Sequence, residues 1–554
     1  MAYPQIVEYN EAVQHPTNAF IDPELRLGSV RVNGLGLPLV LSGGFVLTYT
    51  VTTPQRKWAV RCFHREIPEI QQKYAVISNK LKSLSGTYFV DFNFQKSGII
   101  VGQHGFPIVR MDWVEGDPFD IWLDKNFDNA VVVQRARADF FALASFLERE
   151  GIAHGDISNG NVMMSNGSVK LIDYDGMFVP GLPQGRGSET GHKHFQHPDR
   201  GASDYGPGMD RFSFIALDLS LQAVIEEKAL FKRFRDGGET IVFKANDFAD
   251  PDNSEIFQLL LAKPKLKDQV RNFAAICVGD IKTIPTLEDF LSNRNIPAFK
   301  ALITTFRPAT APRIFGYIAA FPVIDARDYA VALRRVGDRV ELIGQIIEVK
   351  PGVGRRGKGR DRPYVFINFG SWRGSIVKIS IWSEGLDKLA EKPSNAWIGR
   401  WVSVTGLMDP PYVSRRYGYT HLSITVQEDG QIQQLAETQA HFRLASIGKP
   451  MPQRNRDVVG AITGGSKRNS TPTAPLPSGK FSAGRSATAN TITPNRAIVD
   501  RFKQGGAQPP PVKIQGTVVP TLSGTQPPSK RAGIPTWAWV VLGIIVLLFL
   551  LSRR

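Results

Sequence analysis

Residues 154–161 read His-Gly-Asp-Ile-Ser-Asn-Gly-Asn, and residues 173–176 read Asp-Tyr-Asp-Gly. Asn161 follows Asp156 by five positions, and Asp173 follows that amide by twelve. Phosphoryl transfer from a magnesium nucleotide needs one carboxylate beside the attacking hydroxyl. It also needs an amide and a second carboxylate to hold the metal on the phosphates. The residue types and their spacing therefore indicate a phosphoryl-transfer site.

The segments that flank the two motifs fit this interpretation. Residues 140–147 read Phe-Phe-Ala-Leu-Ala-Ser-Phe-Leu, which has the apolar spacing of a helix, and Gly151 is placed to end it. Residues 169–172 read Val-Lys-Leu-Ile, which predicts a short buried strand leading into Asp173. The motifs are thus expected in loops, one after a helix and one after a strand.

The two motifs resemble the catalytic loop and the metal-binding loop of the eukaryotic-like (Hanks-type) protein kinase superfamily, in a divergent, bacterial style. The resemblance implies that Asp156 is the catalytic base, with Asn161 and Asp173 as metal ligands. It implies structural roles for His154 and for Asp210, which would accept hydrogen bonds from the catalytic-loop backbone. It also implies ATP and Mg²⁺ as cofactors and a protein as substrate.

An amino-terminal lobe like that of the family is also indicated. Residues 39–49 predict two strands around a Gly-Gly turn, and residues 57–63 predict a third strand. A helix over residues 67–84 follows, and a strand over residues 107–116 runs into the hinge between the lobes. The ATP-binding residues that the resemblance implies are Gly43, Gly44, Ala59, Arg61, Glu69, Trp113, Val114 and Glu115.

Three positions depart from the family pattern. Arg61 replaces the phosphate-binding Lys and is expected to neutralise phosphate charge during catalysis, with Glu69 as its partner. Because Arg and Lys are not interchangeable at a tight phosphate contact, nucleotide binding is implied more firmly than turnover. Gly155 replaces an Arg, so activity should not depend on activation-loop phosphorylation. Ser158 replaces the Lys of serine/threonine kinases, so hydroxyl specificity is not inherited from the motif.

His-Gly-Asp followed by Asn also marks the aminoglycoside and choline phosphotransferases, which share the fold. Residues 197–200 stand where kinases have Ala-Pro-Glu, and Asp210 opens an apolar helix, as in the protein-kinase branch. An ordinary helix N-cap would also place an Asp there. We therefore expect a protein serine/threonine kinase domain over residues 1–300, acting in signalling. An ATP-binding pseudokinase scaffold and a small-molecule phosphotransferase are the alternatives.

The bulk properties allow several domains in this chain of 554 residues, of which 42% are hydrophobic and 21% charged. Two cysteines exclude a disulfide framework and a zinc site of several thiolates. The net charge of +16 is uneven, because residues 441–554 hold sixteen Lys or Arg against Asp457 and Asp500. That is 16 − 2 = +14, which leaves 16 − 14 = +2 for residues 1–440. The basic excess thus belongs to the tail.

A second domain is predicted over residues 336–435, after a connector over residues 301–335. Three short alternating strands, a helix and two further strands are typical of an OB-fold-like barrel, although a small SH3-like barrel is an alternative. The expected strands are 340–349, 364–369, 376–382, 401–407 and 422–426, and the expected helix is 384–392.

OB-folds bind nucleic acid or sugar through the loops after their first and fourth strands, and here both loops are basic. Cations suit phosphates and aromatic rings stack on bases, which favours single-stranded nucleic acid. The same barrel also serves for protein docking, and a basic hairpin can simply be solvated. The candidate residues for nucleic-acid or partner binding are Arg355, Arg356, Lys358, Arg360, Arg415, Arg416 and Tyr417.

The carboxyl-terminal segment predicts a tether and a membrane anchor. Residues 436–535 are basic and rich in Pro, Ser and Gly, which predicts a disordered linker. Between Arg531 and Arg553 lie twenty-one uncharged residues, which as a helix span about 30 Å, the thickness of a bilayer core. We expect one transmembrane helix over residues 536–552, with the catalytic domain cytoplasmic. The expected fold class is α+β: a bilobal protein-kinase-like domain, a small all-β OB-like barrel, a disordered linker and this single helix.

Overall fold

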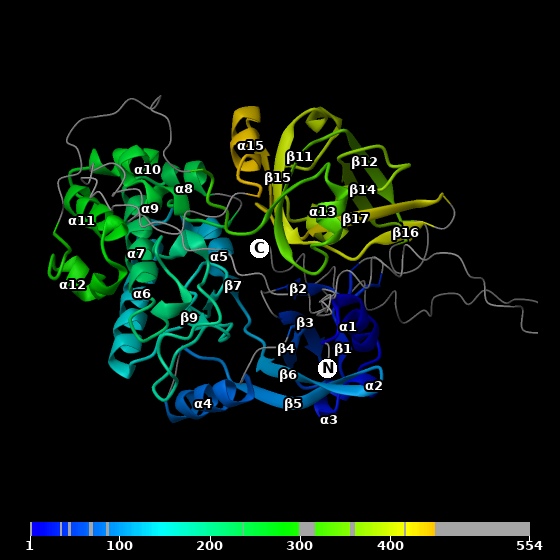
Figure 1. The fold of residues 1–554 in the computed structure, drawn as a ribbon, viewed down its shortest axis with the longest axis horizontal. Coiled ribbons are helices and arrows are strands. Elements are labelled where there is room, and N and C mark those ends of the chain that lie inside the picture. Colours follow the sequence, from blue (N-terminus) through cyan, green and yellow to red (C-terminus); the bar gives the residue numbers. More distant parts are fainter. Residues whose placement is uncertain are drawn as a thin grey trace, which may run out of the picture. The chain divides into compact units, whose positions relative to one another are not determined.

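The structure, a computed structural model, describes residues 3–33, 36–42, 46–65, 70–84, 88–235, 238–298, 316–354, 360–414 and 417–448. All of these residues belong to one compact unit. The described chain is a mixed α+β protein with several sheets (Figure 1).

The amino-terminal part is built on a six-stranded sheet with the order β1-β3-β4-β6-β5, in which β2 also pairs with β3. All of its pairs are antiparallel. Its strands are β1 (Ser29–Val30), β2 (Val40–Ser42), β3 (Val46–Thr52), β4 (Lys57–Phe63), β5 (Phe92–Val101) and β6 (His104–Asp112). Its helices are α1 (Ile6–Val13), α2 (Pro16–Ala19), α3 (Pro23–Arg26) and α4 (Ile70–Ser83).

Both faces of this sheet are buried, because side chains alternate along each strand. On β3 and β4, Leu47 and Val60 pack with α1 in one apolar cluster. Val46 and Phe63 pack with Tyr74 of α4 in another. Arg61 has the same parity on β4 as Phe63, so the alternation assigns its side chain to the α4 face.

The helical part that follows contains a small sheet and a long buried helix. The sheet has the order β7-β8-β9. Its strands are β7 (Asp117–Pro118), β8 (Val162–Ser165) and β9 (Ser168–Leu171). The helices are α5 (Phe119–Asn126), α6 (Ala130–Glu150), α7 (Arg211–Glu226), α8 (Ala229–Phe234), α9 (Ala245–Ala249), α10 (Glu255–Leu261), α11 (Lys267–Val278) and α12 (Leu287–Leu291).

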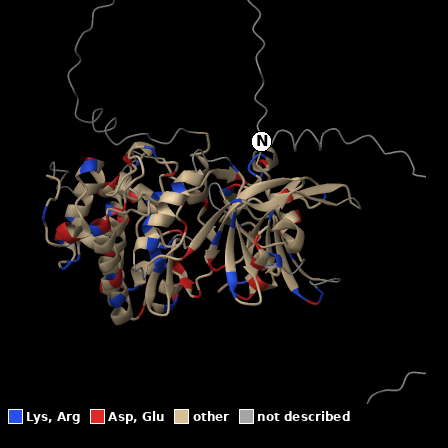
Figure 2. Ribbon diagram, turned by 90° about the horizontal axis from the view of Figure 1, so that it is seen from below, with Lys and Arg blue, Asp and Glu red and all other residues tan. Residues whose placement is uncertain are grey.

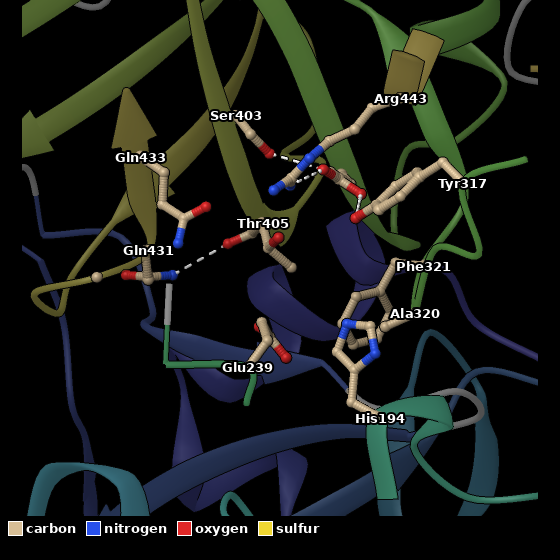
Figure 3. Close-up of a pocket in the computed structure, with 12 residues that line it drawn as sticks. His194, Glu239, Tyr317, Ala320, Phe321, Ser403, Thr405, Gln431, Gln433 and Arg443 are labelled. Atoms are coloured by element: carbon tan, nitrogen blue, oxygen red, sulfur yellow. Dashed lines mark hydrogen bonds and ion pairs between the residues drawn. The ribbon is translucent and has the colours of Figure 1, made fainter. Parts of the chain in front are cut away.

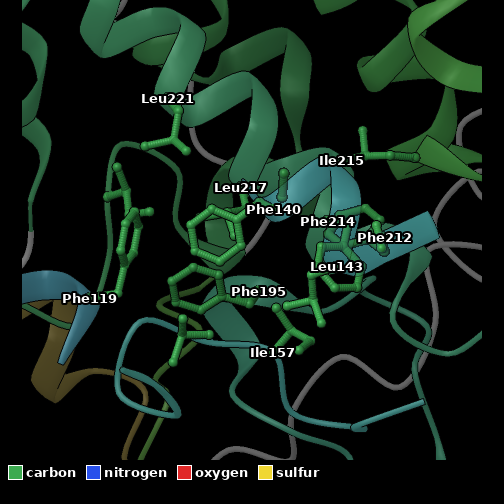
Figure 4. Close-up of a cluster of buried hydrophobic side chains, with 14 of the residues drawn as sticks. Phe119, Phe140, Leu143, Ile157, Phe195, Phe212, Phe214, Ile215, Leu217 and Leu221 are labelled. Carbon is green, nitrogen blue, oxygen red and sulfur yellow. The ribbon is translucent and has the colours of Figure 1, made fainter. Parts of the chain in front are cut away.

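Helix α7 is buried along nearly its whole length and forms the centre of this part. Figure 4 shows Phe212, Ile215 and Leu217 of this helix among Phe140 of α6 and Phe195. Removing one such large apolar side chain from a packed core costs about 3–5 kcal/mol, so this core is a firm base for the loops attached to it.

Helix α6 ends as the sequence indicates. Gly151 follows its last residue with φ +64°, the left-handed conformation that glycine adopts without a steric cost. Its N–H caps the helix by donating to the carbonyl oxygen of Glu148. The chain can therefore turn sharply into residues 154–161.

The carboxyl-terminal described part is mainly β, with two sheets of order β10-β11-β15-β18 and β12-β13-β14-β17-β16. Its strands are β10 (Val323–Asp325), β11 (Arg339–Gln345), β12 (Glu348–Val353), β13 (Pro363–Asn368), β14 (Ile376–Trp382), β15 (Trp401–Leu407), β16 (Tyr412–Ser414), β17 (Tyr419–Val426) and β18 (Ile432–Leu435). The short helices are α13 (Tyr329–Leu333), α14 (Ser383–Leu386) and α15 (Glu437–Leu444).

The predicted single strand over residues 340–349 is divided in the structure. Its first half, β11, pairs with β15, and the chain then bends at Ile346 and Ile347 so that β12 pairs with β13. A second link between the two sheets is the bridge of Met408 to Ile424. The division arises because one bent segment serves two sheets, which a local hydrophobic pattern does not encode.

Three predicted boundaries also need correction. The connector over residues 301–335 contains β10 and α13, and the helix predicted over residues 384–392 is the single turn α14. Gly385, a poor helix former, lies within that turn. The linker predicted from residue 436 begins instead with helix α15.

Helix α15 belongs to the folded part because it completes a buried ion pair. Arg443 donates from Nη1 to Oε1 of Glu341 on β11 over 2.7 Å, and Ser403 of β15 donates to the same oxygen over 2.8 Å. Figure 3 shows these residues lining a pocket together with Tyr317, whose hydroxyl donates to the other oxygen of Glu341 over 2.9 Å. A buried carboxylate without these donors would be costly, so the pairing explains why the helix stays attached.

Lys and Arg are interspersed with Asp and Glu over the described elements in Figure 2, in keeping with the near balance of charge before residue 441. No helix within the described ranges is long and apolar enough to cross a membrane. The predicted transmembrane segment 536–552 lies outside those ranges, as does the predicted linker from residue 449 onward.

Candidate functional site

The loop over residues 154–161 lies between α6 and β8 and is anchored by buried side chains. Asp210, directly before α7, accepts the N–H of Gly155 over 2.8 Å and also the N–H of His154. The His154 ring is bonded through Nε2 to the carbonyl oxygen of Ile172 over 2.9 Å. The loop is therefore tied both to the buried helix and to the segment that precedes the second motif.

Gly155 is required by the backbone at this point. It has φ +85°, and a Cβ there would lie 2.4 Å from the carbonyl oxygen of Gly176. Any larger residue would push the two motifs apart. The close approach of the two loops thus gives a physical reason for glycine where the kinases have Arg.

The carboxylate of Asp156 is oriented by two N–H donors. Asn161 donates from Nδ2 to Oδ2 over 2.7 Å, and also to the backbone oxygen of Asp156 over 3.0 Å. The backbone N–H of His192 donates to Oδ1 over 2.6 Å. Gly191, with φ +73°, brings this segment so close that an added Cβ would lie 3.1 Å from Oδ1. The two donors leave the carboxylate little freedom to rotate.

A buried guanidinium connects β4 to the second motif. Nη2 of Arg61 lies 2.7 Å from Oδ1 of Asp173 and 2.7 Å from Oδ2 of Asp175. Asp173 has φ +68°, a region that non-glycine residues occupy at a cost on the order of 1–3 kcal/mol and that is concentrated at functional sites. The double ion pair holds the loop in this conformation.

The other terminal nitrogen of the same guanidinium makes no hydrogen bond to any described residue. Nη1 of Arg61 is buried and has no hydrogen-bond partner among the described residues. An unsatisfied buried donor costs about 1–3 kcal/mol. The site is therefore set to receive one more acceptor beside Asp173 and Asp175.

Helix α4 supplies donors to this acidic loop. The hydroxyl of Tyr74 donates to Oδ1 of Asp175, and Nζ of Lys73 donates to the backbone oxygen of Asp175. The helix over Ile70–Ser83 contains no Asp or Glu. Glu69, the expected partner of Arg61, lies outside the described residues. The acids that Arg61 contacts in the structure come from the loop instead.

The charges shift the two loop acids in opposite directions. Burial works to raise the pKa of Asp173, but the charge and hydrogen bond of Arg61 outweigh it and hold the pKa below its ordinary value. Burial raises the pKa of Asp175, to which the charge of Asp173 adds, although Arg61 opposes it. Burial lowers the pKa of Lys73, while Asp175 acts in the other direction.

Glu189 is a further acid in this site that the motif spacing did not reveal. Burial, followed by the charges of Asp175, Asp173 and Asp156, raises the pKa of Glu189 to about 8. A Cβ on Gly176 would lie 3.6 Å from Oε2 of Glu189, so the carboxyl is close to residues 173–176. It comes from the segment before His192 and has no sequence signal of its own, because no motif is defined around it.

The predicted nucleotide-binding residues are partly described. Ala59, half-buried on β4, pairs with Thr50 and with Met111 of β6. Trp113 follows β6 and donates its N–H to the carbonyl oxygen of Lys57 over 3.3 Å. Val114 is half-buried, and Glu115 is exposed with one oxygen 2.7 Å from Nζ of Lys57. Residues 113–115 thus follow directly after β6, which pairs with β4, the strand that carries Ala59. Gly43 and Gly44 lie outside the described residues.

The residues present are chemically suited to Mg²⁺, which prefers hard oxygen ligands. Asp173 offers a carboxylate, and Asn161 still has its Oδ1 because its hydrogen bonds are donated through Nδ2. No three His, Cys, Asp or Glu side chains form a ready metal cage in the described ranges. The pair fits a cation that keeps waters and phosphate oxygens as its other ligands.

The second set of predicted residues lies on the β part. Tyr417 is exposed and stacks on Tyr419 with ring centroids 6.1 Å apart, and both rings meet the edge or face of Trp372 at 6.0 Å. Arg360 is exposed, with Nε 3.5 Å from Asp361. The remaining candidates lie outside the described residues, namely Arg355, Arg356, Lys358, Arg415 and Arg416.

The chain was compared with family models, curated proteins and solved structures. No family model matches the chain, and no curated protein matches its sequence. Among solved structures it is similar to the kinase domain of PknI from Mycobacterium tuberculosis, with a TM-score of 0.28 and 14% identity. That match covers 43% of this chain and 86% of the other.

Replacing Glu189 by Gln should change how stability depends on pH. The pKa of Glu189 is about 8 in the folded chain against 4.5 as the ordinary value, so the folded state holds the proton more firmly. Stability from this group is therefore present below pH 4.5 and lost as the pH rises toward 8. Relative to Glu189→Gln, wild type should lose on the order of 4–5 kcal/mol of unfolding free energy over that range, because each pKa unit corresponds to about 1.4 kcal/mol.

Urea unfolding at several pH values measures this difference, and Glu11→Gln on the exposed face of α1 serves as the control. Parallel pH profiles for wild type and Glu189→Gln would contradict the expected effect.

Proposed function

We propose that the chain is an ATP- and Mg²⁺-dependent protein kinase that transfers a phosphoryl group to a Ser or Thr hydroxyl. The observation that carries this proposal is the arrangement around Arg61. Its Nη2 holds the two loop acids, while its buried Nη1 has no acceptor among the residues that the structure describes. A phosphate oxygen is the acceptor that a guanidinium beside metal-binding carboxylates would suit.

The residues of the catalytic loop would divide the chemistry among them. Asp156, oriented by Asn161 and His192, would orient the substrate hydroxyl and take its proton as the oxygen attacks the γ-phosphorus. The bond to ADP would break as the new ester bond forms. Asn161 and Asp173 would hold Mg²⁺, which supplies charge neutralisation on the phosphates when bound. Arg61 would add a fixed positive charge.

The nucleotide would lie against the amino-terminal sheet. Backbone groups of residues 113–115 would bond the adenine edge, with Ala59 on the adenine side, and Gly43 and Gly44 would approach the phosphates. Glu69 would then act only as a secondary partner of Arg61, because Asp173 and Asp175 already compensate its charge.

Transfer of labelled phosphate from ATP to the purified chain or to a test protein measures this activity. Wild type should incorporate label only with Mg²⁺, and Asp156→Asn and Asp173→Ala should each lower the rate by about 100-fold or more, the scale of a lost general base or metal ligand. Asp128→Asn, an exposed change after α5, is the matched control.

An ATP-dependent rise in melting temperature without any transfer would replace the kinase by a pseudokinase scaffold. Transfer to small alcohols or aminoglycosides but to no protein would support a small-molecule phosphotransferase instead. Absence of both binding and transfer in wild type would contradict the proposal altogether.

We also propose that residues 536–552 tether the chain to a membrane as a single span, with the catalytic part cytoplasmic. The support is the uncharged stretch between Arg531 and Arg553. After expression in cells, the full chain should resist alkaline carbonate extraction from membranes, and a chain ending at residue 535 should be released. Release of both would contradict the anchor.

A second proposed function concerns the β part, whose strand order favours an OB-like barrel. One bent segment, β11 and β12, pairs with β15 and with β13, and β14 pairs in parallel with β17. The Met408 bridge to Ile424 joins β15 to β17. The resulting order β12-β13-β14-β17-β15-β11 fits an OB-like barrel of five strands in which β11 and β12 make up one bent strand.

An aromatic cluster on this barrel favours single-stranded nucleic acid as its ligand over a protein partner. Tyr419 stacks on His421 with ring centroids 4.1 Å apart and on Tyr417 at 6.1 Å. Nζ of Lys350 lies 5.2 Å above the ring of Trp372. Tyr417 is exposed, while Trp372 and Tyr419 are half-buried and His421 is buried. Accessible rings interleaved with cations stack bases and track phosphates.

Fluorescence anisotropy with a labelled oligonucleotide tests this proposal on the whole chain. Trp372→Ala should weaken binding about tenfold, because each base stacked on a ring contributes about 1–3 kcal/mol. The affinity should also fall as salt rises. Ile398→Ala, which removes an exposed apolar side chain outside the cluster, should leave binding unchanged. Absent or salt-independent binding by wild type would exclude this ligand.

A further inference from the structure

Asp175 receives contacts from two elements that are distant in the sequence. Arg61 reaches it from β4 over 2.7 Å, and the hydroxyl of Tyr74 reaches its other carboxylate oxygen from α4. Lys73, one residue earlier on the helix, donates to its backbone oxygen. Asp175 is thus the residue through which β4, α4 and the loop of the second motif are joined.

The two acids on Arg61 differ in how accessible they are. The side chain of Asp173 is 34% exposed, whereas that of Asp175 is 5% exposed and that of Arg61 is 4% exposed. Of the two acids, only Asp173 is therefore accessible to a cation from solvent. Asp175 is confined to the protein's own donors.

We propose that Asp175 is a positioning residue that keeps Arg61 charge-compensated, so that Asp173 is available to a metal ion. The inference rests on the proposed nucleotide site. In this arrangement helix α4 controls the site through a carboxylate of the loop, held by Tyr74 and Lys73, rather than through an acid of its own.

The physical reason is the cost of an uncompensated buried cation. A guanidinium buried as fully as that of Arg61 requires an acid within hydrogen-bond distance, and removing a partner from such a pair is strongly destabilising. If Asp173 were its only acid, turning that carboxylate toward a metal ion would leave Arg61 without compensation. With Asp175 in place, Asp173 can turn away while the guanidinium remains paired.

The same geometry makes α4 a determinant of metal affinity. The described helix has no acid, so a family-like pair between this helix and Arg61 cannot form within Ile70–Ser83. Tyr74 is fully buried against Phe63 of β4 and Phe92 of β5, which fixes its ring and hence its hydroxyl. Loss of that hydroxyl should loosen Asp175 without disturbing the apolar contacts.

Isothermal titration of the purified full chain with ATP, once in EDTA and once with excess Mg²⁺, separates the two roles. The dissociation constant in EDTA divided by the dissociation constant with Mg²⁺ reports how much the metal strengthens nucleotide binding. Asp175→Asn should lower this ratio about tenfold, because Asp173 then remains committed to Arg61. Affinity for ATP in EDTA should change less, since Arg61 keeps its charge.

Two further variants keep the test independent of folding. Tyr74→Phe retains the ring and should lower the ratio about threefold, the low end of the net contribution of one hydrogen bond, because the hydroxyl acts on the metal only through Asp175. Asp218→Asn removes an equally buried carboxylate, which is bonded to Nε of Arg137 over 2.7 Å in the helical part, and should leave the ratio within about twofold of wild type.

The outcomes distinguish the inference from the function on which it rests. Wild type that binds no ATP in either condition would overturn both. Wild type that binds ATP with a clear Mg²⁺ gain, together with an unchanged gain in Asp175→Asn or in Tyr74→Phe, would overturn the inference alone. If Asp218→Asn lowered the strengthening of ATP binding by Mg²⁺ as much as Asp175→Asn does, the inference would also be overturned. The effect would then come from general destabilisation.

Discussion

The charge of Arg61 in an otherwise apolar layer between β4 and α4 is the constraint on which the candidate site depends. A guanidinium in that position has to be met by acids, and α4 provides none over its described length. The loop that carries Asp173 and Asp175 therefore closes against the sheet, and Asp173 takes up a left-handed conformation to reach it. The bent conformation of this loop follows from the one buried cation. The buried cation is also met by acids of the loop, to which α4 donates hydrogen bonds, and by no acid of α4 over its described length.

The helical core supplies the opposite half of the site by a different kind of interaction. Asp210 stands at the start of the buried helix α7 and accepts two consecutive backbone N–H groups of the loop before Asp156. Because α7 is fixed by its apolar contacts, these hydrogen bonds transfer its rigidity to the loop. The position of Asp156 is thus fixed by the helical part, while the position of Asp173 is fixed by the sheet through Arg61. The close approach of Gly155 to Gly176 brings the two halves together.

Local spacing in the sequence predicts much of this and fails where distant elements meet. The end of α6 at Gly151 and the strand before Asp173 follow from apolar periodicity and glycine placement, which act over a few residues. The role of Asp175, by contrast, depends on Tyr74, about a hundred positions away in the sequence. The motif itself predicts no role for Asp175. The bend that divides the first barrel strand, and the retention of α15 through Arg443, depend likewise on partners in other strands. Glu189 belongs to no motif and is found only through its three-dimensional neighbours.

The acids gathered around the two loops outnumber the cations that face them, and this excess has an electrostatic consequence. Asp156, Asp173, Asp175 and Glu189 oppose the cations Arg61 and Lys73, so four acids face two bases and two negative charges are in excess when all are ionised. Like charges at low dielectric repel one another. Burial and this repulsion raise the pKa of Glu189 to about 8, so that its carboxyl group stays protonated and removes one negative charge. A divalent cation would balance the same excess without protonation. The proposed Mg²⁺ would thus be stabilised by the same excess of acids that raises the pKa of Glu189.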